Sequence, residues 1–157
     1  MPQSKGIWRK IVVLGVVGGL AFWAITIAIS LLPIAAEYRA AESISNIQAV
    51  WVGSLLVGLI IGFFVSFFLL RFFEKIPTKN PILKTVILSF VLYVISLILL
   101  GVAASRTSDA LHIFLIGAAL NVPTFLILGI VIGYLYKRLY KGVNPAVVAS
   151  KSPQVDS

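Results

Sequence analysis

The residues best suited to chemistry lie inside apolar stretches, and the most unusual group is the sequence Asn121-Val-Pro-Thr124. A proline within a helix removes one backbone hydrogen bond and crowds the preceding turn, so Pro123 predicts a kink. Within lipid, the carbonyl groups that a kink frees must meet a side chain such as Thr124, another helix or water. Two interpretations stay open: a discontinuous helix at a solute or ion site, or a kink held by one interhelical hydrogen bond.

Hydroxyl groups recur near one face of the apolar stretch 85–105, at Thr85, Ser89 and Ser96, with Tyr93 one turn from Ser89. They could line a polar seam opposite Asn121. Alternatively, they bond to backbone carbonyls, as hydroxyls in membrane helices commonly do. The possible solute-lining residues are therefore Ser89, Tyr93, Ser96, Asn121, Pro123 and Thr124.

The chain has few residues that suit catalysis or metal binding. The chain has no cysteine, one histidine and five acidic residues. His112 has no second ligand at metal-binding spacing. The stretches 11–32, 43–70, 85–105 and 114–136 contain no charged residue and no histidine, which proton relays and many ion-coupled carriers require. We therefore predict a protein that is not an enzyme and that has no catalytic, metal or cofactor site.

The length and composition of the apolar stretches indicate a membrane protein. The chain is 60% hydrophobic and 11% charged, with a mean hydropathy of +1.07. Four stretches, 11–32, 43–70, 85–105 and 110–136, each exceed the roughly 20 residues that span a ~30 Å hydrocarbon core. The sequence predicts an all-α polytopic membrane protein, a four-transmembrane-helix bundle with both termini inside. Its helices cover about 8–34, 46–73, 82–105 and 109–138 of a single domain 1–141, followed by a disordered tail 142–157.

The basic residues predict the orientation of this bundle. Eleven of the 13 lysines and arginines fall before the first stretch, between the second and third, or after the fourth. The other two are Arg39 and Arg106. Because cytoplasmic loops of membrane proteins are enriched in Lys and Arg, we expect a multi-pass cell-membrane protein with both termini in the cytoplasm.

Small residues recur at four-residue spacing within the predicted helices, as they do where membrane helices pack closely. The positions are Gly15, Gly19, Ser54, Gly58, Gly62, Ser66, Gly129 and Gly133. These stripes could pack against one another inside the chain, or one of them could face another subunit.

A weak internal repeat accompanies these stripes. The segment 56–64 (LVGLIIGFF) resembles 127–135 (ILGIVIGYL), 71 residues later. If the resemblance reflects duplication, the first two helices correspond to the last two, an arrangement that many transporters use. Apolar helices drawn from few residue types also resemble each other by chance.

The basic residues beside the apolar stretches predict a lipid partner. Anionic headgroups are attracted to lysines and arginines near the membrane surface. The candidates are Arg71, Lys75, Lys79, Lys84, Lys137, Arg138 and Lys141. The same charges could act only in setting the orientation. Because they border membrane spans, they do not indicate nucleic-acid binding.

Two functions of different classes follow. The first is a non-catalytic helix-packing subunit or homo-oligomer that joins a membrane assembly through its small-residue stripes. The second is a small channel or carrier for a neutral or weakly polar solute, lined by Asn121, Thr124 and the hydroxyls of the third helix. We expect the first.

Overall fold

The computed structural model describes residues 3–76, 78–106 and 108–140, and within these ranges every regular element is a helix. The α-helices are α1 Gln3–Ser30, α2 Pro33–Ala41, α3 Ile47–Phe72, α4 Pro81–Ala104 and α5 Ala110–Tyr140, and a short 3₁₀ helix, η1, covers Phe73–Lys75. Four segments are long and apolar enough to cross a membrane: Gly6–Ser30, Ile47–Lys75, Pro81–Ala104 and Ala110–Tyr140. The predicted all-α membrane bundle is therefore confirmed. The predicted tail 142–157 lies outside the described residues.

Prolines and asparagines set the helix boundaries. Leu32 has an extended backbone, as residues before proline prefer, so α1 ends at Ser30 and not at 34. Pro33 then opens α2 in the first turn, where a missing N–H costs nothing. Asn46 and Asn80 are the N-cap residues of α3 and α4. Each side-chain oxygen accepts a hydrogen bond from the backbone N–H two residues later, at 2.9 and 3.0 Å.

The helix α2 is the main element that the sequence reading did not predict. The predicted helix ranges, 8–34 and 46–73, left residues 35–45 as the connection between the first two spans. Its nine residues, Pro-Ile-Ala-Ala-Glu-Tyr-Arg-Ala-Ala, combine a proline in the first turn with four alanines, the best helix former. This composition predicts a short helix once the boundary at Leu32 is recognised.

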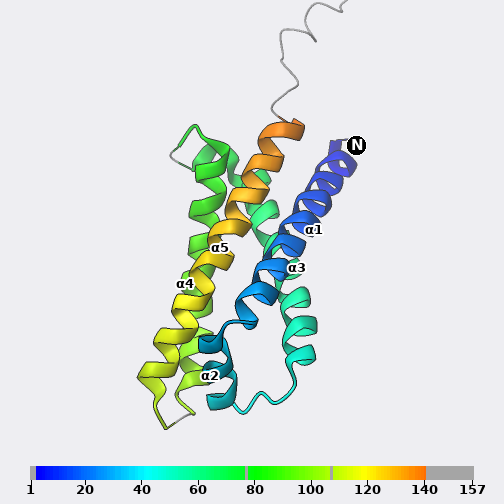
Figure 1. Cartoon of the computed structure of the whole chain (residues 1–157). Coiled ribbons are helices and arrows are strands. Elements are labelled where there is room, and N and C mark those ends of the chain that lie inside the picture. The colour runs from blue at the N-terminus through cyan, green and yellow to red at the C-terminus, as the bar shows by residue number, and fades with distance from the viewer. Residues whose placement is uncertain (1–2, 77, 107, 141–157) are drawn as a thin grey trace, which may run out of the picture.

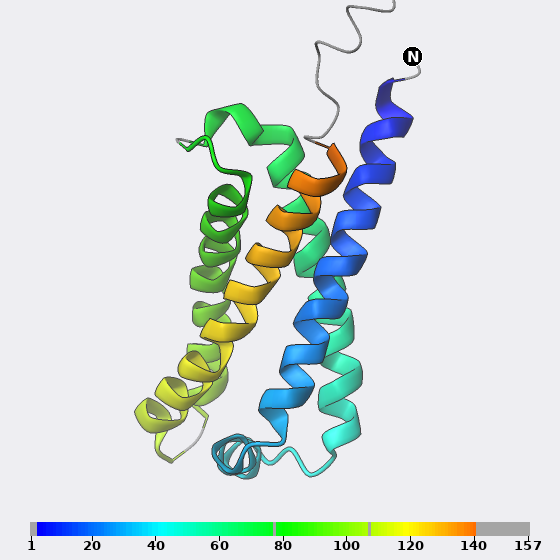
Figure 2. The same cartoon turned by 45° about the horizontal axis from the view of Figure 1, so that its top comes forward.

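The four long helices run side by side and alternate in direction (Figure 1). The start of α1, η1 with the turn that follows it, and the end of α5 lie at one end, which we call the basic end. The opposite end, which we call the α2 end, holds α2 and the start of α5. In Figure 2 the view is along the axis of α2, whereas the long helices are seen from the side. The axis of α2 is therefore oblique to the axes of the long helices.

Glycines join α1 and α3 into a closely packed hairpin. A Cβ atom added at Gly19 would lie 2.8 Å from the Cα of Leu59, and one added at Gly58 would lie 2.8 Å from the carbonyl oxygen of Gly19. Gly15 and Gly62 meet in the same way one turn nearer the basic end. Backbones can approach so closely only where side chains are missing. This stripe therefore packs inside the chain.

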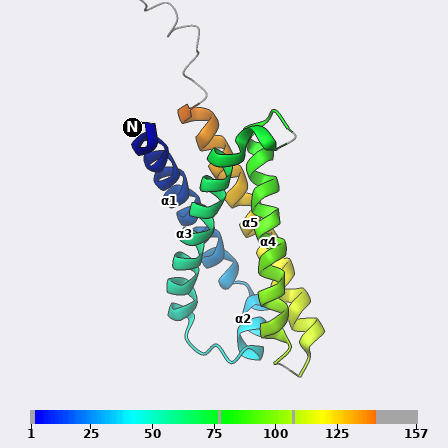
Figure 3. The same cartoon turned by 180° about the vertical axis from the view of Figure 1, so that it is seen from behind.

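The helices α4 and α5 form a second hairpin of the same kind. A Cβ atom at Gly129 would lie 2.8 Å from the Cα of Val86, and one at Gly133 would lie 2.5 Å from the Cα of Ile82. The most extensive helix contacts in the described chain are those within these two hairpins. Figure 3 shows α3 and α4 close together at the basic end and diverging towards the α2 end.

Between the hairpins the contact is made by side chains. Ile132 and Leu128 of α5 lie against Gly18 of α1. In the half of the bundle nearer the basic end, the core is closed by aliphatic side chains with no solvent exposure: Leu14, Val65, Leu69, Leu128 and Ile132. The two cavities next to Asn121 lie in the other half.

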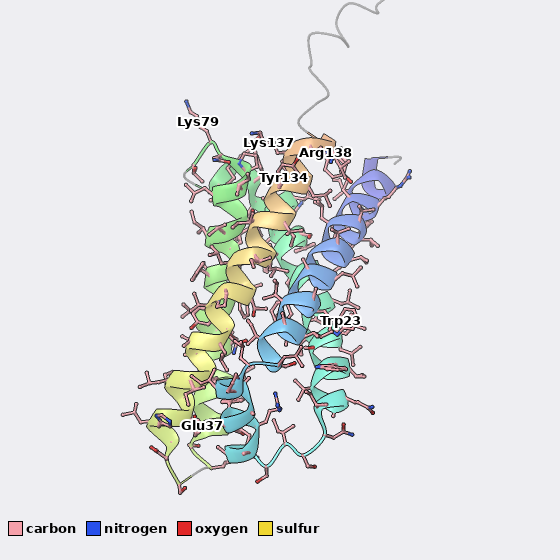
Figure 4. The ribbon with its side chains drawn as sticks, viewed as in Figure 1. Trp23, Glu37, Lys79, Tyr134, Lys137 and Arg138 are labelled. Carbon is pink, nitrogen blue, oxygen red and sulfur yellow. The ribbon has the colours of Figure 1, made fainter. Side chains whose placement is uncertain are left out.

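The candidate lipid-contacting residues gather at the basic end, where Lys79, Lys137 and Arg138 are visible in Figure 4. Arg71, Lys75, Lys79, Lys137 and Arg138 are exposed. Arg71 lines a groove of about 400 Å³ between the basic ends of α1 and α3, together with Trp8 and Phe67. Lys141 lies outside the described residues.

Lys84 differs from the other basic residues because it is only 4% exposed. Its ammonium group donates a hydrogen bond to the carbonyl oxygen of Phe73 and lies 3.8 Å from the centre of the Phe73 ring. A positive charge at the end of a helix is favourable, because the carbonyl groups there carry partial negative charge. Lys84 thus fastens the start of α4 to the junction of α3 and η1, and it is not available to a headgroup.

Replacing Lys84 with alanine is expected to destabilise the protein by about 2 kcal/mol, because the Phe73 carbonyl loses a charged donor and the ring loses a cation. The measurement is unfolding of the purified protein in detergent micelles. Lys79→Ala is the matched control, since Lys79 is exposed on the same connection. Equal stabilities of the two variants would contradict this role for Lys84.

Candidate functional site

The α2 end encloses a partly open cavity of about 130 Å³, which we call the α2 cavity. It lies between the hairpins, because α1 and α3 line one side and α5 lines another, with α2 covering it. Its polar lining residues are Thr26, Ser30, Tyr38, Arg39, Asn121 and Thr124. Most of the remaining lining is aliphatic. The α2 cavity therefore offers a few directed polar groups within an apolar wall, as small-molecule sites typically do.

A chain of hydrogen bonds holds one wall of the α2 cavity in place. The Arg39 guanidinium donates from Nη1 to the carbonyl oxygen of Ser30 at 2.5 Å, and so caps the end of α1. The Ser30 hydroxyl accepts a hydrogen bond from Trp51 Nε1 at 3.0 Å. Trp23 Nε1 in turn donates to the carbonyl oxygen of Trp51 at 2.9 Å. These contacts fix α2 and the start of α3 against α1.

The segment 121–124 lies opposite that wall, in a helix that continues without a break. The helix α5 extends from Ala110 to Tyr140 and includes Pro123. Asn121 Nδ2 donates to the carbonyl oxygen of Gly117, one turn earlier in the same helix, at 2.7 Å. Its Oδ1 accepts no hydrogen bond from any described residue. Thr124 is 2% exposed and lines the α2 cavity, whereas Pro123 faces outward.

A second cavity, of about 280 Å³, adjoins Asn121 from the other side. We call it the α3–α4 cavity, because it lies where these helices diverge. It is lined mainly by apolar side chains of all four long helices, with Tyr93 and Ser96 as its polar residues besides Asn121. The Tyr93 hydroxyl donates to the carbonyl oxygen of Ala118 at 3.0 Å, which provides a hydrogen bond between α4 and α5 in the turns that precede Pro123.

The hydroxyls of α4 do not form one continuous seam. Ser96 lines the α3–α4 cavity and donates to the carbonyl oxygen of Tyr93. Ser89 is fully buried, donates to the carbonyl oxygen of Val86 and lies against Gly129. Ser89 is therefore part of the packing of the second hairpin, nearer the basic end than either cavity.

In the first hairpin, the two serines of the small-residue stripe bond to their own helix. The Ser66 hydroxyl is fully buried and donates to the carbonyl oxygen of Gly62 at 2.7 Å. The Ser54 hydroxyl donates to the carbonyl oxygen of Trp51 at 3.0 Å. Their donors are thus used internally, and neither serine lines the cavities.

The electrostatics of the α2 cavity are set by α2. Burial, and secondly the nearby Glu42 carboxylate, raise the pKa of Tyr38, so its hydroxyl stays protonated at neutral pH. Glu42 Oε1 is itself buried and has no hydrogen-bond partner among the described residues. Glu37 instead pairs with His112 of α5 at 3.0 Å, near the surface. Neither glutamate is within ion-pair distance of Arg39.

The polar groups around the two cavities are suited to binding a small molecule. The described residues hold no group of three or more histidines or acidic residues that could bind a metal ion. These polar groups are hydrogen-bond donors and acceptors and one guanidinium. What they can do is orient a small molecule.

Comparison with known proteins gives no further guidance, since no family model, curated protein or solved structure matches this chain. Within the cavities, the sequence reading had singled out Tyr93, Ser96, Asn121 and Thr124. It missed Tyr38 and Arg39 because α2 was expected to be a loop. The alanine-rich segment after Pro33 is the signal that would have placed a helix, and so these side chains, against the bundle.

Proposed function

We propose that this chain is a small, non-catalytic carrier that binds its solute between the two hairpins, beside Asn121. The observation that carries this proposal is the asymmetry of the bundle. The α2 cavity and the α3–α4 cavity adjoin in one half, while the half nearer the basic end is closed by fully buried aliphatic side chains. A binding site that is reachable from one end and closed at the other is what a carrier presents in one of its two states.

The packing of the helices supports a movement that could open the other end. Each hairpin is held together by glycine contacts between backbones, which favour a rigid unit. The hairpins meet each other through ends of side chains such as Ile132. A rocking of one hairpin against the other would therefore break fewer close contacts than a movement within a hairpin.

The assembly function remains a second proposal, but the glycine stripes no longer favour it. Gly58 and Gly62 are buried against α1, so a partner would have to bind another face of the bundle. The wide apolar surface of α4 is equally suited to lipid, and nothing in its residues specifies a protein.

The orientation and the lipid contacts belong to the same proposal. We place the basic end in the cytoplasm, with both termini inside, because the lysines and arginines concentrate there. Anionic lipids would then meet the exposed Arg71, Lys75, Lys79, Lys137 and Arg138. The α2 cavity would open on the outer side.

The direct test is flux of small neutral and weakly polar solutes into liposomes that contain the purified protein. Asn121→Leu is expected to lower the flux of any transported solute at least about fivefold, since losing a polar contact to a bound ligand typically costs about 1 kcal/mol or more. Val122→Leu is the matched control, because Val122 is the next residue of α5 and faces outward. Wild-type flux that equals the flux of empty liposomes across the whole panel would overturn the proposal for a neutral or weakly polar solute.

A further inference from the structure

We propose that the two cavities together bind one single-chain anionic amphiphile, with its acidic group at Arg39 and its hydrocarbon chain in the α3–α4 cavity. This inference rests on the proposed function, because it names the class of molecule that the site between the hairpins would take. It departs from the neutral solute that the uncharged helices predict, since the charge comes from α2.

Arg39 supplies the reason for an acidic group. It is half-buried, it lines the α2 cavity, and it is the only cationic side chain among the described residues that does so. One of its five N–H donors is used by the carbonyl oxygen of Ser30. The guanidinium fork matches a carboxylate or phosphate in geometry as well as in charge.

Among the described residues, no acidic side chain forms an ion pair with this guanidinium. The one ion pair among the described residues joins Glu37 to His112. Glu42, three residues after Arg39 and directly after the end of α2, forms no ion pair with it. A guanidinium in a mostly apolar cavity is costly without an anion, so a ligand that brings one is stabilised there.

The α3–α4 cavity supplies the reason for a hydrocarbon chain. Its wall is built from side chains such as Phe22, Ile61 and Phe125, and it has about twice the volume of the α2 cavity. Its edge is formed by Val57 and Leu99, which are 47% and 71% exposed on the outer surface of the bundle. In a membrane this edge faces lipid, so a chain could enter from the bilayer.

Asn121 lies where the two parts of such a ligand would meet. It lines both cavities, and its Oδ1 is free of described hydrogen-bond donors. A small inorganic anion would occupy the Arg39 side alone and would leave the larger apolar cavity unfilled. An amphiphile fills both, and so accounts for a guanidinium and an apolar cavity on either side of one polar residue.

The test compares two probes that differ only in the head group, hexadecanoate and hexadecanol, by native mass spectrometry of the full chain released from detergent. We expect one hexadecanoate per chain, bound more tightly than hexadecanol. Arg39→Gln should weaken hexadecanoate binding at least tenfold and leave hexadecanol binding unchanged. Arg106→Gln is the control, because Arg106 is exposed at the same end of the bundle and lines neither cavity.

A second variant tests the other half of the site. Ala103→Phe places a ring in the α3–α4 cavity and should weaken both probes. Equal binding of both probes to the wild type, or equal loss of both in Arg39→Gln, would overturn the inference. Neutral-solute flux without hexadecanoate binding would overturn this inference and leave the carrier proposal standing. Hexadecanoate binding without flux of any solute would overturn the carrier proposal and leave the binding of an anionic amphiphile standing.

Discussion

Gly62→Ala is expected to destabilise the protein by about 3 kcal/mol or more, although the change adds a single methyl group. The new Cβ would press on the carbonyl oxygen of Gly15 and would lie 2.9 Å from the backbone nitrogen of Gly19. A side chain could rotate away from such an overlap, but these atoms belong to the backbone of α1. The two helices must therefore separate along their contact, and overpacking that forces backbone shifts has a cost of this order.

The control for this prediction is Gly53→Ala in the same helix. A Cβ atom at Gly53 meets nothing within 4 Å, so the replacement should stabilise α3 slightly, by roughly 0.5 kcal/mol, because alanine restricts the unfolded chain. Unfolding in detergent micelles distinguishes the two variants. A fully stable Gly62→Ala protein that instead loses an oligomeric state would mean that this stripe faces another subunit.

The sequence predicted the parts of the fold that depend on composition and spacing. Four apolar runs gave four spans, and the four-residue spacing at Gly58 and Gly62 marked a close helix contact. Which surface meets that stripe could not be predicted, because spacing identifies a smooth face but not its partner. The position of Gly15 and Gly19 opposite it depends on the relative rotation and height of two helices, which only the folded chain defines.

The candidate site was predictable only in part for a related reason. Asn121 and Thr124 stood out because polar residues beside a proline are unusual within an apolar run. Arg39 did not, because a charged residue between two spans is ordinary. Its contact with the bundle arises from the fold of α2 back over the end of α1, where Pro33 ends one helix and starts another. Lys84 was assigned to the lipid surface for the same reason, and the structure places it in the interior.

A disulfide between residues 18 and 132 is expected to abolish transport while leaving the fold intact. A Cβ atom at Gly18 would lie 2.5 Å from Cγ1 of Ile132, and Cγ1 is one bond from its own Cβ. The two Cβ atoms are thus at most about 4 Å apart, which is within the range for a disulfide. Replacing Ile132 also removes the atoms that a cysteine at Gly18 would meet. The chain contains no cysteine, so Gly18→Cys with Ile132→Cys creates a unique pair.

This cross-link joins the hairpins within the closed half of the bundle. If transport requires that half to open by movement of one hairpin against the other, the oxidised double variant should show the flux of empty liposomes, and a reductant should restore it. Each single variant, treated with the same oxidant, should keep its flux, which separates the lock from the substitutions themselves. Undiminished flux through the oxidised protein would mean that the solute crosses without separation of α1 and α5, and the carrier mechanism would then give way to a static path.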